Sequence, residues 1–374
     1  MKFLLFFTIL QFHINSYSFL TFNATILNTL NGKIQGKSIN VTISNVTSRV
    51  LVWQSVPYAE PPIKNLRFMN PVPVKPWKKI IDGTKPPKAC MQPFLNKTNV
   101  SEDCLYLNIY SPEENYIKNV NNNNKSSLLP ILVWMHGGFF RYGSSSDYDG
   151  SIFSAKSNII VITLNYRLGL FGFFHMNGTD ANGNQALLDQ NLALKWIYDN
   201  AKEFGGDKNR ITISGESAGY HLIFSQSWPY FNNAILQSGN PIALNYETLL
   251  LTSDEANHLA VQISSKLGCS NIECVQSIDK EVLNQHSEMV KLPSFVLGND
   301  SFNQHPKKLF SLGKFKRCNV LLGFNNYEEL SLAEREIGKD LVYQMIYGDF
   351  NSFKTIFTAF SWYGAALPSI MSPN

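Results

Sequence analysis

Short apolar runs alternate with longer helical patterns from Leu105 onward. The segment 187–203 places its apolar positions at the helical period, whereas the short runs have the length and β-branched character of strands. This alternation is typical of the α/β class, in which helices flank a buried and mostly parallel sheet. The predicted strands are 105–110, 131–135, 159–164, 211–213, 234–236 and 320–322.

The regions outside this alternation complete the predicted domain. Thr- and Val-containing segments separated by turn signals run from Phe22 to Tyr58 and predict N-terminal antiparallel strands. The Asn-rich segment 114–127 has few apolar residues and is predicted to be a flexible surface loop. Because the strands on either side of it must share one sheet, and because no repeat is present, we expect a single domain over residues 19–374.

The N-terminus has the pattern of a secretory signal peptide. Lys2 precedes an apolar run from Phe3 to Phe12, and the small residues Ser16 and Ser18 follow. The run is much shorter than the roughly 20 residues of a membrane-spanning helix. We therefore expect a signal peptide over residues 1–18, no transmembrane segment, and a secreted protein. Glycosylation sequons agree with export; they begin at Asn23, Asn40, Asn45, Asn96, Asn99, Asn124, Asn177 and Asn299.

Composition narrows the possible partners. The 374 residues are 44% hydrophobic and 16% charged, and 32 basic against 28 acidic side chains give a formal charge of +4 with no long basic run. Neither nucleic acid nor an anionic membrane is implied. Among the five cysteines, Cys90 with Cys104 and Cys269 with Cys274 are near enough in sequence to close short loops in an oxidising compartment. Cys318, next to an apolar predicted strand, is expected to be a core thiol.

The strongest chemical signal is the pentapeptide 215–219, which reads Gly-Glu-Ser-Ala-Gly. It follows the predicted strand 211–213 and precedes a helical pattern. A strand, a sharp turn and a helix in this order form a nucleophile elbow, in which small neighbours let the serine adopt a strained backbone and present its hydroxyl. Ser217 is therefore the candidate nucleophile. The simpler alternative is a serine in an ordinary turn.

With the segment 204–219 the chain resembles the type-B carboxylesterase and cholinesterase family. Further segments similar to that family are 57–62, 66–68, 101–108, 165–167, 188–190 and 237–239. The resemblance implies an α/β-hydrolase fold, Ser217 as the nucleophile of ester hydrolysis, and a small-molecule carboxylic ester as substrate, with no cofactor and no metal. It also implies the disulfides Cys90–Cys104 and Cys269–Cys274, and buried ion pairs that join Glu102 to Arg67 and Arg167 to Asp189.

The candidate oxyanion hole lies in the segment 136–139, which follows the predicted strand 131–135. Acyl transfer needs backbone amides directed at the developing oxyanion, and glycines let the main chain approach the substrate. We expect donors from Gly137 or Gly138, from the next amide, and from Ala218. The sequence departs from the family at Phe139, where a small residue is usual, and this bulk is expected to narrow the acyl pocket. A simple tight turn is the alternative.

A serine nucleophile also needs a base that is held by an acid. The segment 323–328 resembles the family's acid segment and gives Glu328 as the candidate, with Glu329 as the alternative. The base is missing, because all seven histidines precede Glu328 and the family places its histidine after the acid. His221, four residues after Ser217, is expected to run along its helix without meeting the hydroxyl.

The sequence is thus expected to be a C-terminally incomplete member of the family. A second shortening directly after Gly219 removes about five residues and would rotate the following helix by roughly 140°. An incomplete or mis-spliced gene model and a degenerate paralogue are both open explanations. The competing functions are a catalytically inactive adhesion protein of the neuroligin type and an inactive fragment. The segment 90–104 lacks the tryptophan that binds quaternary ammonium in cholinesterases, which favours uncharged esters. The oligomeric state is left undetermined.

Overall fold

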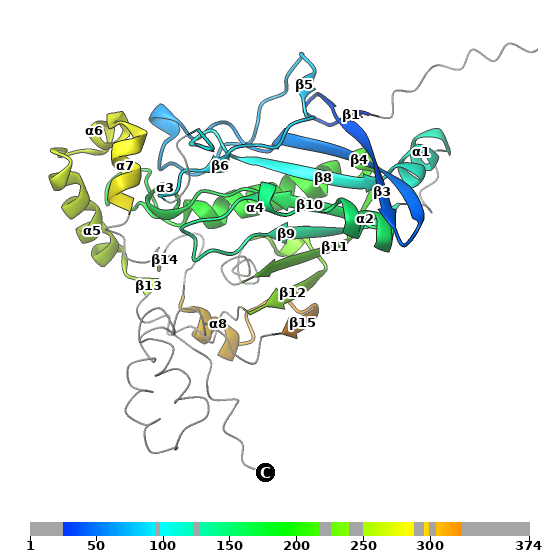
Figure 1. Cartoon of the computed structure of the whole chain (residues 1–374). Coiled ribbons are helices and arrows are strands. Elements are labelled where there is room, and N and C mark those ends of the chain that lie inside the picture. Colours follow the sequence, from blue (N-terminus) through cyan, green and yellow to red (C-terminus); the bar gives the residue numbers. More distant parts are fainter. Residues whose placement is uncertain are drawn as a thin grey trace, which may run out of the picture.

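A computed structural model describes residues 25–93, 98–122, 128–216, 226–238, 250–287, 295–298 and 304–323. Its centre is an eight-stranded sheet (Figure 1). From one edge to the other the strands are β15 (Asn319–Gly323), β12 (Asn233–Gln237), β11 (Gly206–Glu216), β9 (Leu129–Met135), β10 (Ile160–Leu164), β8 (Tyr106–Pro112), β4 (Val46–Pro57) and β3 (Lys37–Ile43).

Strand directions confirm the predicted mixture of parallel and antiparallel pairing. The strands β15, β12, β11, β9 and β10 are parallel to one another, whereas the pairs β10–β8, β8–β4 and β4–β3 are antiparallel. Every residue of β10 is buried, as its uninterrupted apolar sequence requires for a strand covered on both faces. Smaller pairings join β1 (Ile26–Asn28), β2 (Lys33–Gln35) and β5 (Ile81–Asp82), then β6 (Ala89–Cys90) with β7 (Val100–Ser101), and β13 (Leu250–Leu251) with β14 (Phe295–Val296).

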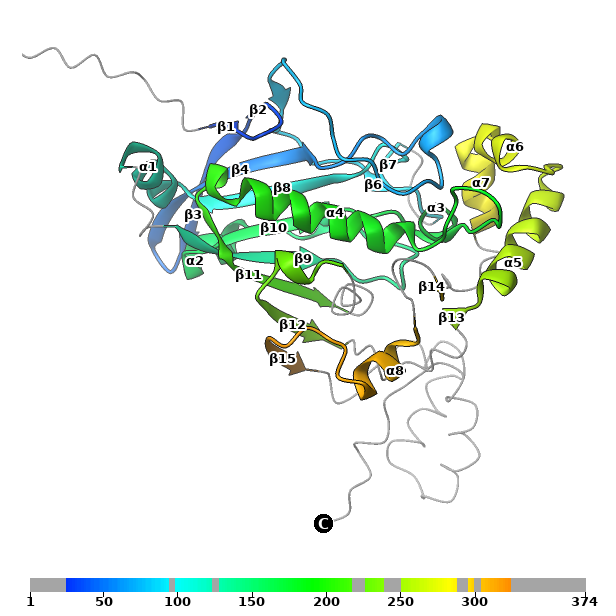
Figure 2. The ribbon, with the colours of Figure 1, turned by 180° about the vertical axis from the view of Figure 1, so that it is seen from behind.

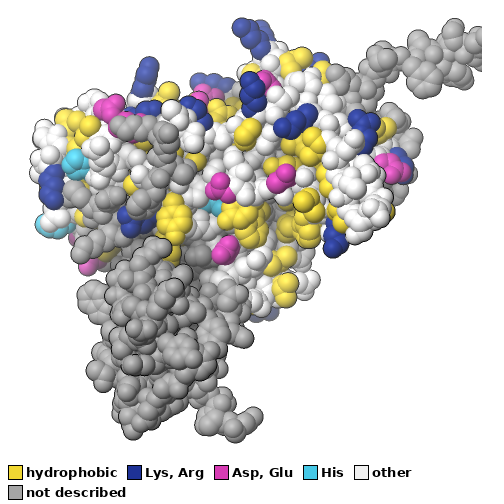
Figure 3. Space-filling view, viewed as in Figure 1, with side chains coloured by type: hydrophobic (Ala, Val, Ile, Leu, Met, Phe, Trp, Pro, Cys, Tyr) yellow, Lys and Arg dark blue, Asp and Glu magenta, His cyan; other side chains and the backbone are white. Residues whose placement is uncertain are grey.

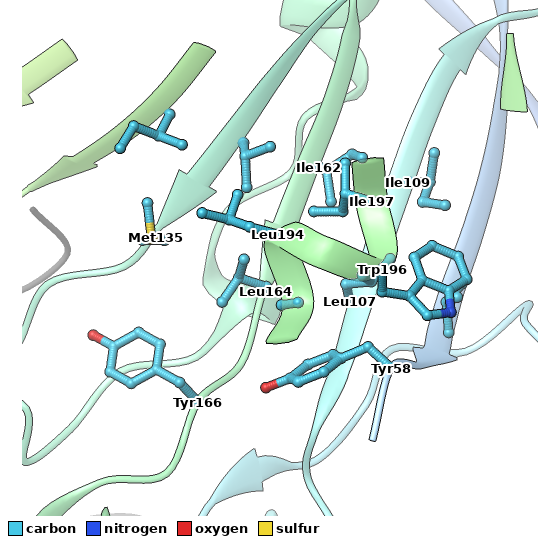
Figure 4. Packing of buried hydrophobic residues seen from close by; sticks show 14 of the residues in the cluster. Tyr58, Leu107, Ile109, Met135, Ile162, Leu164, Tyr166, Leu194, Trp196 and Ile197 are labelled. Carbon is cyan, nitrogen blue, oxygen red and sulfur yellow. The ribbon is translucent and has the colours of Figure 1, made fainter. Parts of the chain in front are cut away.

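Helices cover both faces of the sheet. The strand alternation places Ile109 and Ile162 toward the larger core with α4 (Gln185–Asn200), whereas Tyr110 and Val161 face the core next to α2 (Ser151–Ser157). Figure 4 shows side chains of α4 lying against the β8 and β10 strands, and Figure 2 shows α4 crossing the sheet on the face hidden in Figure 1. The other helices are α1 (Glu113–Asn122), α3 (Gly169–Phe173), α5 (Ser253–Lys266), α6 (Ile272–Ser277), α7 (Lys280–His286) and α8 (Pro306–Ser311).

The segment predicted as a loop at 114–127 begins instead with helix α1, so this prediction was wrong for its first part. Tyr116 is buried and its ring lies 5.3 Å from that of Trp53, while Glu113 forms an ion pair with Arg49. Acidic residues in the first turn also favour the helix electrostatically. Tertiary packing of one aromatic side chain has therefore overridden a weak local preference.

Strand β15 occurs where it was predicted but is not buried. Val320, Leu321 and Leu322 are 51%, 65% and 51% exposed, because β15 is the last strand on its side among the residues that the structure describes. Cys318 is accordingly half-buried against the core and not enclosed by it, and partial burial raises its pKa. The expectation of a fully buried strand and a core thiol was wrong in this respect.

The predicted covalent and ionic links are present. Cys90 is bonded to Cys104 and Cys269 to Cys274. The guanidinium of Arg67 donates to both carboxylate oxygens of Glu102 at 2.5 and 2.6 Å, and also to the carbonyls of Gln276 and Ile278 at 2.8 and 2.6 Å. This ties the segment after β4 to the end of α6. The Arg167–Asp189 pair is buried in the same way.

The surface shows no concentration of one charge on the face seen in Figure 3, where basic and acidic side chains are scattered. None of the described helices has the length and apolar character that crossing a bilayer would require. The expected signal peptide, residues 1–18, lies outside the described residues.

Candidate active site

The candidate site lies where β9 and β11 end side by side. The two strands are parallel, with Gly215 opposite Met135, so their carboxyl ends lie at the same end of the sheet and the chain leaves both strands there. Strand β9 leads directly into Gly137 and Gly138, and β11 ends at Glu216, one residue before Ser217. Ligand sites of open α/β sheets form at the carboxyl ends of strands, where this pair ends.

The other two predicted catalytic segments are reached from neighbouring strands. Ser217 and Ala218 themselves, and Glu328 with its alternative Glu329, lie outside the described residues. Strand β15 ends at Gly323, five residues before Glu328, and pairs in parallel with β12, which pairs with β11. The carboxyl ends of β11 and β15 therefore lie at the same end of the sheet. The chain leaves β11 there toward Ser217, and it leaves β15 there toward Glu328.

The glycine segment after β9 is a tight turn with an unusual backbone. Gly138 has a φ of +109°, and Phe139 and Phe140 follow at +54° and +56°. The amides of Arg141 and Tyr142 both donate to the Gly138 carbonyl, at 2.9 and 3.1 Å. A Cβ on Gly138 would lie 2.2 Å from the Tyr142 carbonyl oxygen, so only glycine fits.

This turn leaves amides available to a ligand. Within the part of the chain that the structure describes, the amide groups of Gly137, Gly138 and Phe139 donate to no protein acceptor, and all three residues are half-buried. Buried or half-buried amides are normally paired. Consecutive unpaired donors in the segment that follows β9 are the type of group that binds an oxygen carrying negative charge.

His136 fixes the start of the turn. Its ring is buried and stacks on Tyr166 with centroids 4.4 Å apart and planes 13° from parallel, while the Tyr166 hydroxyl donates to the His136 carbonyl. Nδ1 lies 2.9 Å from the Gly137 carbonyl oxygen. Burial lowers the pKa of His136 from 6.5 to about 4. A neutral, packed imidazole with this pKa supports the turn and is unsuited to act as the general base.

Acidification is expected to destabilise the protein through His136. Because the folded-state pKa is depressed, the unfolded chain binds the proton more tightly, so stability falls as the pH drops from about 6.5 to about 4, by up to about 3 kcal/mol. Urea denaturation of wild type and His136→Gln at several pH values in this window checks it. The free energy of unfolding of the variant should depend less steeply on pH than that of the wild type. Equal slopes for the two proteins would contradict the conclusion that His136 is buried in its neutral form.

The end of the turn is held by Gln92, a contributor to the site that no sequence pattern identifies. Its amide oxygen accepts from the Gly143 amide at 3.0 Å and its amide nitrogen donates to the Gly143 carbonyl at 2.9 Å. Asn284 in turn donates to the Gln92 carbonyl at 3.0 Å. The contact joins residues far apart in sequence, and no local pattern signals it. Gln92 follows Cys90 of the Cys90–Cys104 disulfide, so that disulfide also restrains the site.

Of the four other described histidines, three have side-chain contacts with residues outside the turn, and the fourth, His305, directly precedes α8. His175 contacts the side chains of Asn177 and Ser253, His258 contacts Gln262, and His286 lies against the carbonyl of Val282. His221 lies outside the described residues. The described part of the chain thus provides candidate oxyanion donors, whereas the contacts of His136, His175, His258 and His286 do not join these side chains to the end of β11.

Known proteins resemble this chain over most of its length. A sequence model of the carboxylesterase family matches residues 23–360. The chain is 33% identical over 327 residues to pyrethroid hydrolase Ces2e of Rattus norvegicus, covering 81% of this chain and 55% of that protein. It is 33% identical over 328 residues to acylcarnitine hydrolase of Mus musculus, covering 81% and 56%.

A third relative is acetylcholinesterase of Bungarus fasciatus, which is 35% identical over 332 residues, covering 79% of this chain and 52% of that protein. The chain therefore spans about half the length of the curated relatives that it matches. The matched half contains the sheet from β3 to β15 and the turn at Gly137 and Gly138.

Proposed function

Because the chain belongs to the carboxylesterase family, whose fold is the α/β-hydrolase, we propose that the protein hydrolyses carboxylic esters through an acyl-enzyme on Ser217. One observation carries the proposal. Strands β9 and β11 are parallel neighbours, so the segment after β9 begins next to the end of β11, one residue before Ser217. In that segment the amides of Gly137, Gly138 and Phe139 have no acceptor among the described residues. A nucleophile and an oxyanion hole are the two elements that acyl transfer needs first.

In this reaction the Ser217 hydroxyl oxygen forms a bond to the ester carbonyl carbon, and the carbonyl oxygen becomes an oxyanion. The amides of Gly137 or Gly138, of the next residue and of Ala218 donate to that oxyanion. The Ser217 proton passes to a base and then to the alkoxide that the tetrahedral intermediate expels, so the alcohol departs and the acyl group stays on Ser217. Water releases the acid in a second, equivalent cycle.

The proton of Ser217 needs an acceptor, and Glu328 is the proposed acid that would orient a histidine base. No histidine follows Glu328 in these 374 residues. Serine hydrolases without one triad member keep about a thousandfold to ten-thousandfold advantage over water from the oxyanion hole and binding. We therefore propose that this chain on its own acylates slowly and selectively at Ser217.

The proposed substrates are uncharged esters, and the proposed compartment is extracellular. The segment between Cys90 and Cys104 contains no tryptophan to stack on a quaternary ammonium group. Two disulfides favour an oxidising compartment, in agreement with the signal-peptide pattern over residues 1–18. Asparagine sequons on the surface are then sites for N-linked sugars.

Acylation of the purified chain by excess p-nitrophenyl acetate tests the proposal. Mass spectrometry of its peptides should find one acetyl group on Ser217, formed over a prolonged incubation. Ser217→Ala should abolish that peptide adduct. Ser214→Ala is the matched control, since Ser214 is a buried serine three residues earlier in β11 and should not react.

Equal acetylation of wild type and Ser217→Ala would reject the acyl-enzyme. The same assay with acetylthiocholine addresses the substrate class: the acylation rate should be no higher than with an uncharged thioester of similar size. A clear preference for acetylthiocholine would reject the assignment to uncharged esters while leaving Ser217 as the nucleophile.

A further inference from the structure

Strand β3 is an unusually unprotected edge of the main sheet. It is the outermost strand on its side, and among the described residues no strand pairs with its outer edge (Figure 1). Its pairing with β4 runs without a register shift from Lys37 opposite Val52 to Ile43 opposite Val46. The edge is therefore regular and seven residues long.

The sequence of this edge has few of the usual protective devices, since its charged side chains are Lys37 at the start of β3 and Arg49 of β4, which donates to Ser38 at 3.2 Å. No charged residue, proline or glycine stands between Lys37 and Arg49, and the strand is composed of Ser, Ile, Asn, Val and Thr after Lys37. Natural edge strands are normally blunted by charges, proline, bulges or a covering segment, because unpaired backbone groups are a template for another chain. Uncharged segments of high β-propensity are the ones that pair between molecules.

Two glycosylation sequons lie on this hairpin. Asn40, followed by Val41 and Thr42, is within β3, and Asn45, followed by Val46 and Thr47, is at the turn into β4. Both asparagines are exposed, and neither side chain has a hydrogen-bond partner within the described part of the chain. Each amide nitrogen is thus free to carry a sugar without breaking a contact.

The strand geometry places these two positions on one face of the edge hairpin and at its tip, next to the unpaired side of β3. Val41 is buried toward the core that contains Ala155 of α2, so the neighbouring Asn40 faces the opposite side of the sheet, where it is exposed. Asn45 has a φ of +69° at the tip of the hairpin and is next to Val46, which is 67% exposed. A bulky hydrophilic group at each site would obstruct a second strand approaching the face or the tip.

We propose that N-linked glycans on Asn40 and Asn45 protect the β3 edge and keep it from pairing with the same edge of a second copy of this chain. The glycans take the place of the charged side chains that other proteins carry on such strands. The inference rests on the proposed export, because the sugars are added only in the secretory pathway.

The test uses the full chain secreted from a eukaryotic cell line. Glycopeptide mapping should find sugar on Asn40 and Asn45, and light scattering after size exclusion should give one oligomeric state. In Asn40→Gln/Asn45→Gln the associated fraction at the same concentration should rise several-fold. Asn40→Lys/Asn45→Lys, which also lacks the sugars but restores charge, should behave like wild type. Asn99→Gln is the matched control and should not associate, because it removes an exposed sequon outside the eight-stranded sheet whose amide nitrogen donates to no acceptor among the described residues.

A second sample of the wild type is secreted in the presence of a mannosidase inhibitor, which keeps its glycans in the high-mannose form. Trimming this folded protein with endoglycosidase H should produce the same association, and that result would exclude a folding defect of the variants as the cause. Three results would overturn the inference: bare Asn40 and Asn45 in a protein glycosylated at Asn99, an unchanged oligomeric state in the Gln variant and after trimming, or equal association of the Gln and Lys variants. A chain that is not secreted and carries no sugar anywhere would reject the proposed export together with this inference.

Discussion

Alanine in place of Gly138 is expected to lower the rate of Ser217 acylation by about a hundredfold or more, the cost of losing an oxyanion-hole donor. The added Cβ would lie 2.2 Å from the Tyr142 carbonyl oxygen, and φ at +109° is disfavoured for any residue with a side chain. The turn has to open to relieve both problems, which moves the amides of Gly137 and Gly138. A time course of acylation by p-nitrophenyl acetate measures the loss.

Gly268→Ala is the matched control for backbone strain. Gly268 also has positive φ, at +73°, but no atom lies within 4 Å of the position that a Cβ would take there. This variant should lose about 1 to 2 kcal/mol of stability and acylate like wild type. If Gly138→Ala acylates as fast as Gly268→Ala, the turn after β9 does not hold the oxyanion.

Asp189→Ala is expected to cost about 3 to 5 kcal/mol in the free energy of unfolding, because it leaves the Arg167 charge buried without a partner. The Arg167 side chain is 3% exposed and that of Asp189 is fully buried. Three nitrogens of Arg167, including its backbone amide, donate to the carboxylate at 2.6 to 3.0 Å. Urea denaturation followed by fluorescence gives the change in midpoint and slope.

Two further variants separate the charge effect from simple truncation. Arg167→Met/Asp189→Leu removes both charges and should be less destabilised than Asp189→Ala alone. Asp207→Ala breaks a pair with Arg210 in which the side chains are 25% and 50% exposed, and it should change stability by about 1 kcal/mol or less. Equal losses for Asp189→Ala and Asp207→Ala would contradict a structural role for the buried pair.

The burial of a strand could be predicted from the sequence where the strand is apolar throughout and other elements also cover it. Strand β10 is apolar throughout and buried throughout, so its position in the sheet centre could be predicted. Strand β15 has the same kind of sequence but is exposed, because burial depends on which elements cover a strand and not on its own residues. Helix α1 was missed for the converse reason: the packing of Tyr116 against Trp53 is a tertiary contact that composition does not reveal.

In the candidate site too, some residues could be predicted from the sequence and others could not. The glycines after β9 could be identified because a motif requires that residue type at that spacing. Gln92 could not, since its two hydrogen bonds to Gly143 span 51 residues and any polar side chain of suitable length could have been expected there. The stacking of His136 on Tyr166 was equally hidden, although His136 stood in the candidate oxyanion segment and Tyr166 in a segment that resembles the family.

The central claim is that Ser217 is the nucleophile and that the turn after β9 holds the oxyanion. A crystal structure of the chain after prolonged reaction with a phosphonofluoridate tests it most directly, because the bound phosphonyl oxygen imitates the oxyanion. We expect phosphorus bonded to Ser217 Oγ, with its oxygen about 3 Å from the amide nitrogens of Ala218 and of Gly137 or Gly138. An adduct on Ser217 whose oxygen faces solvent, away from the turn after β9, would contradict it.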